Sequence, residues 1–78
     1  MSVRERVLQV IARVAENVEV ISNPQIHLYQ TGLLDSFATV ELMVQLEEEF
    51  GIPFSPADFD PEAWATPEKI VAIVESRV

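Results

Sequence analysis

The sequence predicts an all-α fold, a small bundle of three main helices and one short helix. Three observations support this: apolar residues recur every third or fourth position, helix-start and helix-stop residues flank these stretches, and no segment alternates like a strand. The chain has 78 residues, so we expect a single domain over residues 1–78. A core of this size leaves no room for a deep, enclosed active site.

Residues 3–18 are predicted to form the first helix. Their apolar side chains fall on one stripe at helical spacing: Val3, Val7, Val10, Ile11, Val14 and Val18. The segment Ser22-Asn23-Pro24 ends any helix, because Pro24 lacks an N–H donor and moves Asn23 out of the helical region. Residues 23–35 then form a long loop, which we expect to be held to the core by Ile26, Leu28, Leu33 and Leu34. A loop of this length in so small a domain indicates function.

The second main helix is predicted to run over residues 36–50. Ser36, which follows Asp35 directly, is expected as its N-cap, because serine is a favoured capping residue and the periodic apolar residues begin immediately after it. Gly51 is expected to end the helix, since glycine readily adopts the left-handed conformation found just past a helix C-terminus.

Two further helical segments are expected after residue 54. Residues 55–60 favour one short helical turn. Thr66-Pro67 gives a stronger start signal, and it precedes a last helix that carries Ile70, Val71, Ile73, Val74 and Val78. Trp64 is expected to anchor the loop before that helix, and packing in the core is favoured over contact with a partner.

The second main helix carries two apolar stripes. When residues are placed at about 100° per step, one compact stripe is predicted to face the core: Thr39, Leu42, Met43, Leu46 and Phe50. The opposite stripe, with its acidic neighbours, is called the docking face and consists of Phe37, Val40, Glu41, Val44, Glu47 and Glu48. A helix on the outside of a small bundle cannot bury both stripes, so we expect the docking face to bind partners. The alternative is that another helix or the long loop covers it.

The charge of the chain is strongly negative. Thirteen acidic residues against five basic ones give a net charge of −8, and no Lys or Arg occurs from residue 14 to residue 68. Such a surface repels nucleic acid and anionic lipid, so neither is expected as a partner, and it attracts a basic protein patch. The alternative is that the acidity only keeps a small protein in solution.

The composition excludes several kinds of chemistry. The chain has no cysteine and a single histidine, His27, which excludes disulfides, thiolate metal sites and histidine clusters. We expect no catalytic residue and no resident metal, because Ser36 lacks a base with an orienting group and the acidic residues lack the spacing of a calcium loop. No signal-peptide pattern or bilayer-length apolar run is present, so a cytoplasmic location without membrane insertion is expected.

Ser36 is the candidate functional residue. It stands at a predicted helix start beside the docking face. A helix N-terminus favours an anionic group through its free N–H donors and its dipole, so a phosphodiester on this serine is well placed. On position alone, however, a simple cap worth about 1 kcal/mol is the more economical interpretation.

The stretch GLLDSFATVEL, residues 32–42, resembles the attachment motif of the acyl carrier protein family. The helical layout, the acidity and the long first loop resemble that family too. The resemblance implies that Ser36 carries a covalent 4′-phosphopantetheine arm. It also implies that Asp35 helps a phosphopantetheinyl transferase to present the serine with a magnesium ion, and that the docking face engages partner enzymes.

Two longer segments, NPQIHLYQTGLLDSF and FDPEAWATPEKIV, resemble one branch of that family, the D-alanyl carrier proteins of the teichoic acid D-alanylation system. This resemblance implies a non-catalytic monomer that holds D-alanine as a thioester. A D-alanine:carrier protein ligase loads it, and a membrane-bound acyltransferase takes the D-alanine toward lipoteichoic acid. Ala38 departs from the glycine usual in that branch. A carrier for another fatty acid, polyketide or amino acid pathway, or an interaction module without a prosthetic group, stays open.

Overall fold

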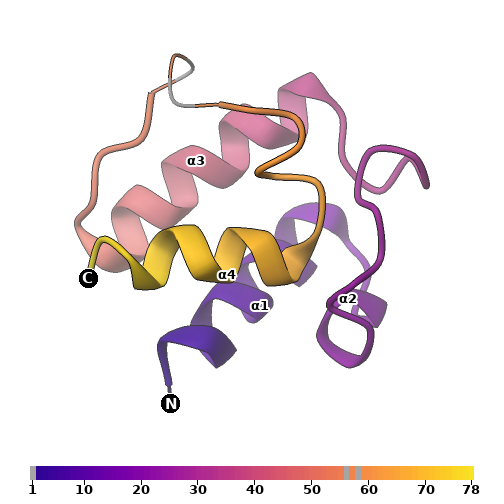
Figure 1. Cartoon of the computed structure of the whole chain (residues 1–78), viewed down its shortest axis with the longest axis horizontal. Helices are drawn as coiled ribbons and strands as arrows, with labels where there is room; N and C mark the ends of the chain where they lie inside the picture. Colours follow the sequence, from indigo (N-terminus) through magenta and orange to yellow (C-terminus); the bar gives the residue numbers. More distant parts are fainter. Residues whose placement is uncertain (1, 56, 58) are drawn as a thin grey trace.

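The computed structural model describes residues 2–55, 57 and 59–78. The described residues contain no strand, and their helices are α1 (Val3–Ala15), α2 (Glu19–Ser22), α3 (Ser36–Phe50) and α4 (Pro67–Glu75), as Figure 1 shows. Helix α1 packs against each of the other three. The predicted all-α bundle of three main helices and one short helix is confirmed.

Helix α1 is shorter than predicted. It begins after Ser2, whose hydroxyl accepts a hydrogen bond from the Glu5 N–H at 3.1 Å. It ends at Ala15 because Glu16 adopts the left-handed conformation, with φ of 53°. The Asn17 N–H then donates to the Ala12 carbonyl at 3.0 Å, the backbone pattern of a Schellman C-terminus.

The prediction of a helix over residues 3–18 was therefore wrong at its C-terminal end. Val18, assigned to the apolar stripe of that helix, lies beyond its end and is 76% exposed. The structure also contains a short helix that the sequence analysis did not predict. It is α2, started by the Asn17 side chain, which accepts from the Glu19 N–H at 2.8 Å, and ended before Asn23-Pro24 as expected. The turn predicted over residues 55–60 falls partly outside the described residues, since Pro56 and Asp58 are not described.

The starts and stops of α3 and α4 follow local chemistry. Gly51 ends α3 in the left-handed conformation, with φ of 68°, as predicted. Thr66 caps α4 by accepting from the Lys69 N–H at 3.2 Å, and Pro67 occupies the first turn, also as predicted. Helix α4 ends at Glu75, so the expectation that it carries Val78 was wrong; that residue lies beyond the helix and is exposed.

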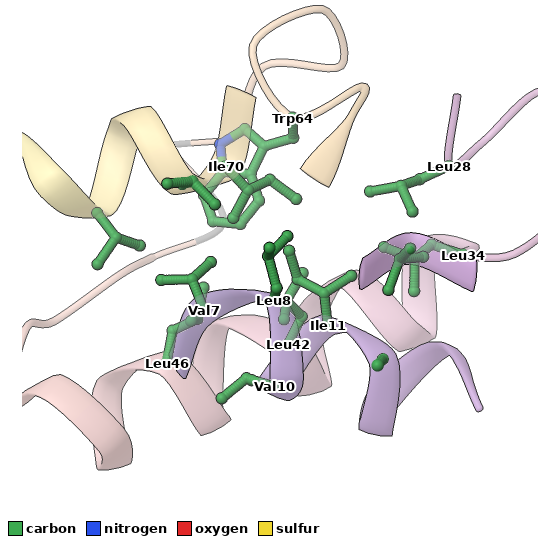
Figure 2. Close-up of a cluster of buried hydrophobic side chains, with 14 of the residues drawn as sticks. Val7, Leu8, Val10, Ile11, Leu28, Leu34, Leu42, Leu46, Trp64 and Ile70 are labelled. Carbon is green, nitrogen blue, oxygen red and sulfur yellow. The ribbon is translucent and has the colours of Figure 1, made fainter. Parts of the chain in front are cut away.

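One hydrophobic core joins the helices and the long loop. Figure 2 shows side chains from α1, α3, α4 and the loops meeting in it, among them Val7, Leu8, Ile11, Leu42, Leu46, Trp64 and Ile70. Leu28 and Leu34 are buried, and Ile26 and Leu33 pack against the core, so the loop over residues 23–35 is held as predicted. Trp64 is buried too, with its ring edge-to-face against Phe54 at 5.7 Å. The packed loop over residues 23–35 therefore fixes the path of the chain to the start of α3.

Candidate functional site

Ser36 is the first residue of α3 and is exposed. It does not act as the N-cap, and that prediction was wrong: the cap is Asp35. Both residues are good caps, and the extended backbone at Asp35 (φ −126°, ψ −171°) decides between them. Within the described part of the chain, the Ser36 hydroxyl has no hydrogen-bond partner. The interpretation of Ser36 as a simple cap is therefore excluded, and its hydroxyl is available for chemistry.

Asp35 closes the first turn of α3 with both its side chain and its backbone. Its Oδ1 accepts from the Ala38 N–H at 2.8 Å, and its carbonyl accepts from the Thr39 N–H at 2.9 Å. Among the described residues, no hydrogen bond engages the N–H groups of Ser36 and Phe37. These two donors and the helix dipole favour a negative group at this end of the helix.

A shallow apolar groove of about 200 Å³ opens beside Ser36. Its walls come from two parts of the chain far apart in sequence: Ser36, Thr39, Val40, Met43 and Phe59. Phe59 was missed as a neighbour of the serine, because only the tertiary fold brings the two together. The signal available in the sequence was its place in the FDPEAWATPEKIV segment, which carries part of the family resemblance.

Tyr29 is a second residue to which sequence reasoning assigned no role. Its hydroxyl lies 2.7 Å from the Thr39 Oγ1, and the Thr39 hydroxyl in turn donates to the Asp35 carbonyl at 2.8 Å. Partial burial raises the pKa of Tyr29, which favours the protonated phenol. The long loop is thereby hydrogen-bonded to the first turn of α3.

The apolar stripe of the docking face is uncovered in the structure. Phe37 is 86% exposed, and Val40 and Val44 are 50% and 48% exposed. The alternative that another helix or the long loop buries this stripe is excluded for the described residues. The three flanking carboxylates, Glu41, Glu47 and Glu48, are exposed as well.

The charges on α3 are divided between its two sides. Glu49, on the side toward α1, forms an ion pair with Arg6 at 2.8 Å. In the part of the chain that the structure describes, Glu41, Glu47 and Glu48 have no ion pair. The carboxylates of the docking face therefore keep their full negative field toward solvent.

No group of three His, Asp or Glu side chains among the described residues is arranged to hold a metal ion. The Nδ1 of His27 accepts from the Gln30 N–H at 3.1 Å, so this atom serves a turn of the long loop. The site offers instead a free hydroxyl, a helix N-terminus, an apolar groove and an acidic docking face.

Comparison with known proteins decides what this combination means. Residues 5–74 match the family described as "Phosphopantetheine attachment site". The chain belongs to this phosphopantetheine-attachment family. The predicted family and the predicted cofactor, 4′-phosphopantetheine, are thereby confirmed, and carriers of this family are generally non-catalytic.

Curated relatives narrow the similarity within the phosphopantetheine-attachment family. The chain is similar to the D-alanyl carrier proteins of Listeria welshimeri, Listeria monocytogenes and Enterococcus faecalis. Each is 42% identical over 76 residues, which covers 97% of this chain and 97% of the relative.

In the described residues, no helix has both the length and the apolar character needed to cross a membrane.

Proposed function

We propose that this chain is a single carrier domain whose Ser36 bears the phosphopantetheine arm, and that its cargo is D-alanine destined for lipoteichoic acid. The observation that carries the proposal is the exposed Ser36 hydroxyl, free of any cap bond, at the start of α3 and inside the matched family span. The printed name of the relatives, D-alanyl carrier protein, supports the cargo.

Attachment of the arm is a phosphoryl transfer from coenzyme A. The Ser36 Oγ forms a bond to the phosphorus next to pantetheine, the P–O–P anhydride bond breaks, and 3′,5′-ADP leaves; a base of the transferase takes the hydroxyl proton. The residues around Ser36 fit the group. The unengaged N–H groups of Ser36 and Phe37 and the helix dipole favour its phosphodiester, and the groove beside Ser36 offers apolar surface.

The arm supplies the thiol for thioester chemistry, which this cysteine-free chain lacks. Asp35 has a structural part in the site, since its carboxylate fixes the first turn through the Ala38 N–H. By the family resemblance it also contributes to the magnesium site of the transferase during attachment. The chain itself holds and presents the cargo and catalyses no step.

The proposed partners are a phosphopantetheinyl transferase, a D-alanine:carrier protein ligase and a membrane-bound acyltransferase, visited in turn by a cytoplasmic monomer. The docking face suits such visits. Phe37, Val40 and Val44 offer an exposed apolar centre, and the unpaired carboxylates around it steer a basic partner into contact. A small interface of this type releases its partner readily, as a carrier requires.

Intact-mass measurement tests the attachment residue. The purified chain is incubated with coenzyme A and a phosphopantetheinyl transferase, together with Ser36→Ala and the matched control Ser22→Ala, which removes another exposed helical serine. We expect one phosphopantetheine to add to the parent chain and to the control, and none to Ser36→Ala. A modified Ser36→Ala chain would place the arm on another residue and contradict the proposal.

A second incubation tests the cargo. The modified chain is offered D-alanine, L-alanine and a fatty acid in turn, each with ATP and a ligase of matching specificity. We expect a mass gain of one alanine with the D-alanine ligase only. Loading by a fatty-acid or L-amino-acid ligase alone would assign the chain to another carrier pathway, the possibility that Ala38 leaves open.

A further inference from the structure

We propose that Tyr29 is a positioning residue for the modification of Ser36. Through Thr39 it holds the first turn of α3, and with it the serine, in the geometry that the transferase recognises. This inference rests on the proposed function, because it concerns how Ser36 is presented. The Tyr29 phenol contacts Thr39 and not Ser36, so its effect on the serine is indirect.

The direction of the hydrogen bonds follows from the number of protons. The Thr39 hydroxyl has one proton, which it donates to the Asp35 carbonyl at 2.8 Å. At the Tyr29–Thr39 contact of 2.7 Å, Thr39 is therefore the acceptor and the Tyr29 phenol is the donor. The result is a continuous chain from the phenol, through the Thr39 hydroxyl, to the carbonyl of the residue just before Ser36.

The surroundings of Tyr29 make it a firm point of attachment. Its ring is half-buried and packs edge-to-face against Phe59, with centroids 5.9 Å apart, and against His27 at 6.5 Å. Phe59 and Thr39 both line the groove beside Ser36. Tyr29 thus contacts two residues that line the groove, Phe59 and Thr39, and through Thr39 it is linked to the turn that presents the serine.

The first turn of α3 needs such support because helix ends fray in isolation. Ser36 is exposed, and no hydrogen bond among the described residues holds its side chain. Its position is therefore set by the two bonds to the Asp35 carbonyl and by the Asp35 cap. If the turn frays, the transferase meets a smaller fraction of competent chains, which raises the apparent KM for the carrier and leaves kcat unchanged at saturation.

Four variants separate this role from general stability. Tyr29→Phe removes the phenol hydroxyl and keeps the ring; Thr39→Val removes the central hydroxyl; Thr39→Ser retains it and is the conservative rescue. The matched control is Thr31→Val, which removes the 2.6 Å hydrogen bond from Thr31 to the His27 carbonyl within the same loop. That bond does not reach α3.

Two measurements are made on each variant: steady-state kinetics with coenzyme A and a phosphopantetheinyl transferase, and hydrogen exchange of the Ala38 and Thr39 amides. For Tyr29→Phe we expect KM for the carrier to rise about twofold to fivefold, kcat to hold, and both amides to exchange about fivefold faster. We expect Thr39→Val to show at least these changes. Thr39→Ser and Thr31→Val are expected to match the parent chain.

The outcomes distinguish this inference from the proposed function. An unmodified parent chain overturns both. A modified parent chain with an unchanged KM for Tyr29→Phe overturns the inference alone. A KM for Thr31→Val that rises as much as that of Tyr29→Phe also overturns it, because loosening the loop anywhere would then suffice. Failure of Thr39→Ser to restore the parent KM shows that the hydroxyl is not what matters, with the same consequence.

Discussion

The two faces of α3 use similar side chains for opposite purposes. On the inner face Leu42 and Leu46 are fully buried, whereas on the outer face Phe37 is 86% exposed and Val44 48% exposed. All four are apolar residues within one fifteen-residue helix. Apolar side chains on the inner face are buried by the chain itself, and those on the outer face stay exposed, which supports the proposal that a partner protein covers them.

The acidic residues divide in the same way. Glu49 is neutralised by Arg6 from α1, with an Arg6 Nη2 to Glu49 Oε2 distance of 2.8 Å. Glu47 and Glu48, beside it in the sequence, have no such partner among the described residues. A run of three glutamates therefore contains one structural residue and two whose field points outward. Sequence neighbours on a helix need not share a function.

The largest expected effect is on stability, when one apolar side chain on each of the two faces is truncated to alanine. Leu46→Ala should lower the free energy of unfolding by about 2–5 kcal/mol, because it leaves a cavity in the core. Val44→Ala should change it by less than about 0.5 kcal/mol, since its environment is already half solvent. Urea denaturation of both variants measures the difference. Equal losses would show that the outer face is covered in solution.

In assays with a partner enzyme, by contrast, substitutions on the outer face should have the larger effect. Phe37→Ala should reduce kcat/KM for loading by the D-alanine ligase about tenfold, as for an aromatic anchor at an interface centre. Its stability should stay close to that of the parent chain. Loading kinetics and a urea titration of the same preparation check both expectations. A loading rate unaffected by loss of Phe37 would remove this residue from the docking face.

The glutamates give a smaller and more selective effect. The double variant Glu47→Gln with Glu48→Gln should slow association with the ligase severalfold at low salt and weaken its salt dependence. The control Glu49→Gln loses the Arg6 ion pair and should leave the salt dependence unchanged. Stopped-flow association at several ionic strengths measures this. If all three glutamates contribute equally, the division between structural and steering charges is wrong.

The smallest effect concerns Tyr29, which is hydrogen-bonded to Thr39, a buried polar residue of the inner face. Burial raises the pKa of its partner Tyr29, so the folded state favours the neutral phenol. The associated stability is present below the ordinary tyrosine pKa near 10 and is lost as pH rises through the raised value. Urea midpoints measured between about pH 8 and about pH 11 should fall more for the parent chain than for Tyr29→Phe. Parallel pH profiles would contradict this.

Features of the fold that depend on a few adjacent residues were predictable from the sequence. Gly51 and Thr66-Pro67 mark helix ends because their backbone or capping preferences act locally. The end of α1 was not predictable in this way, because a glutamate, Glu16, adopts the left-handed conformation there and its residue type gives no sign of it. The choice of Asp35 over Ser36 as the cap was equally hidden, since both residue types cap helices well.

The candidate site also contains features that adjacent residues determine and features that only the folded chain determines. Ser36 and the docking face follow from a motif and from helical periodicity within one segment, so the sequence was sufficient to nominate them. The groove and the Tyr29–Thr39 bond join segments that meet only in the folded chain. Periodicity along one helix carries no information about Phe59 approaching Ser36, so these features required the structure.

The long loop is joined to the start of α4 by two hydrogen bonds between backbone atoms only. The Leu28 N–H donates to the Ala65 carbonyl at 2.7 Å, and the Glu68 N–H donates to the Pro24 carbonyl at 2.9 Å. Replacing a side chain at these positions leaves both bonds available, unless proline removes a donor. Inserting or deleting a residue between 24 and 28 moves one partner out of register with the other. These bonds therefore constrain the length of this stretch whatever its side chains are, whereas its composition is constrained at Ile26 and Leu28, which pack in the core.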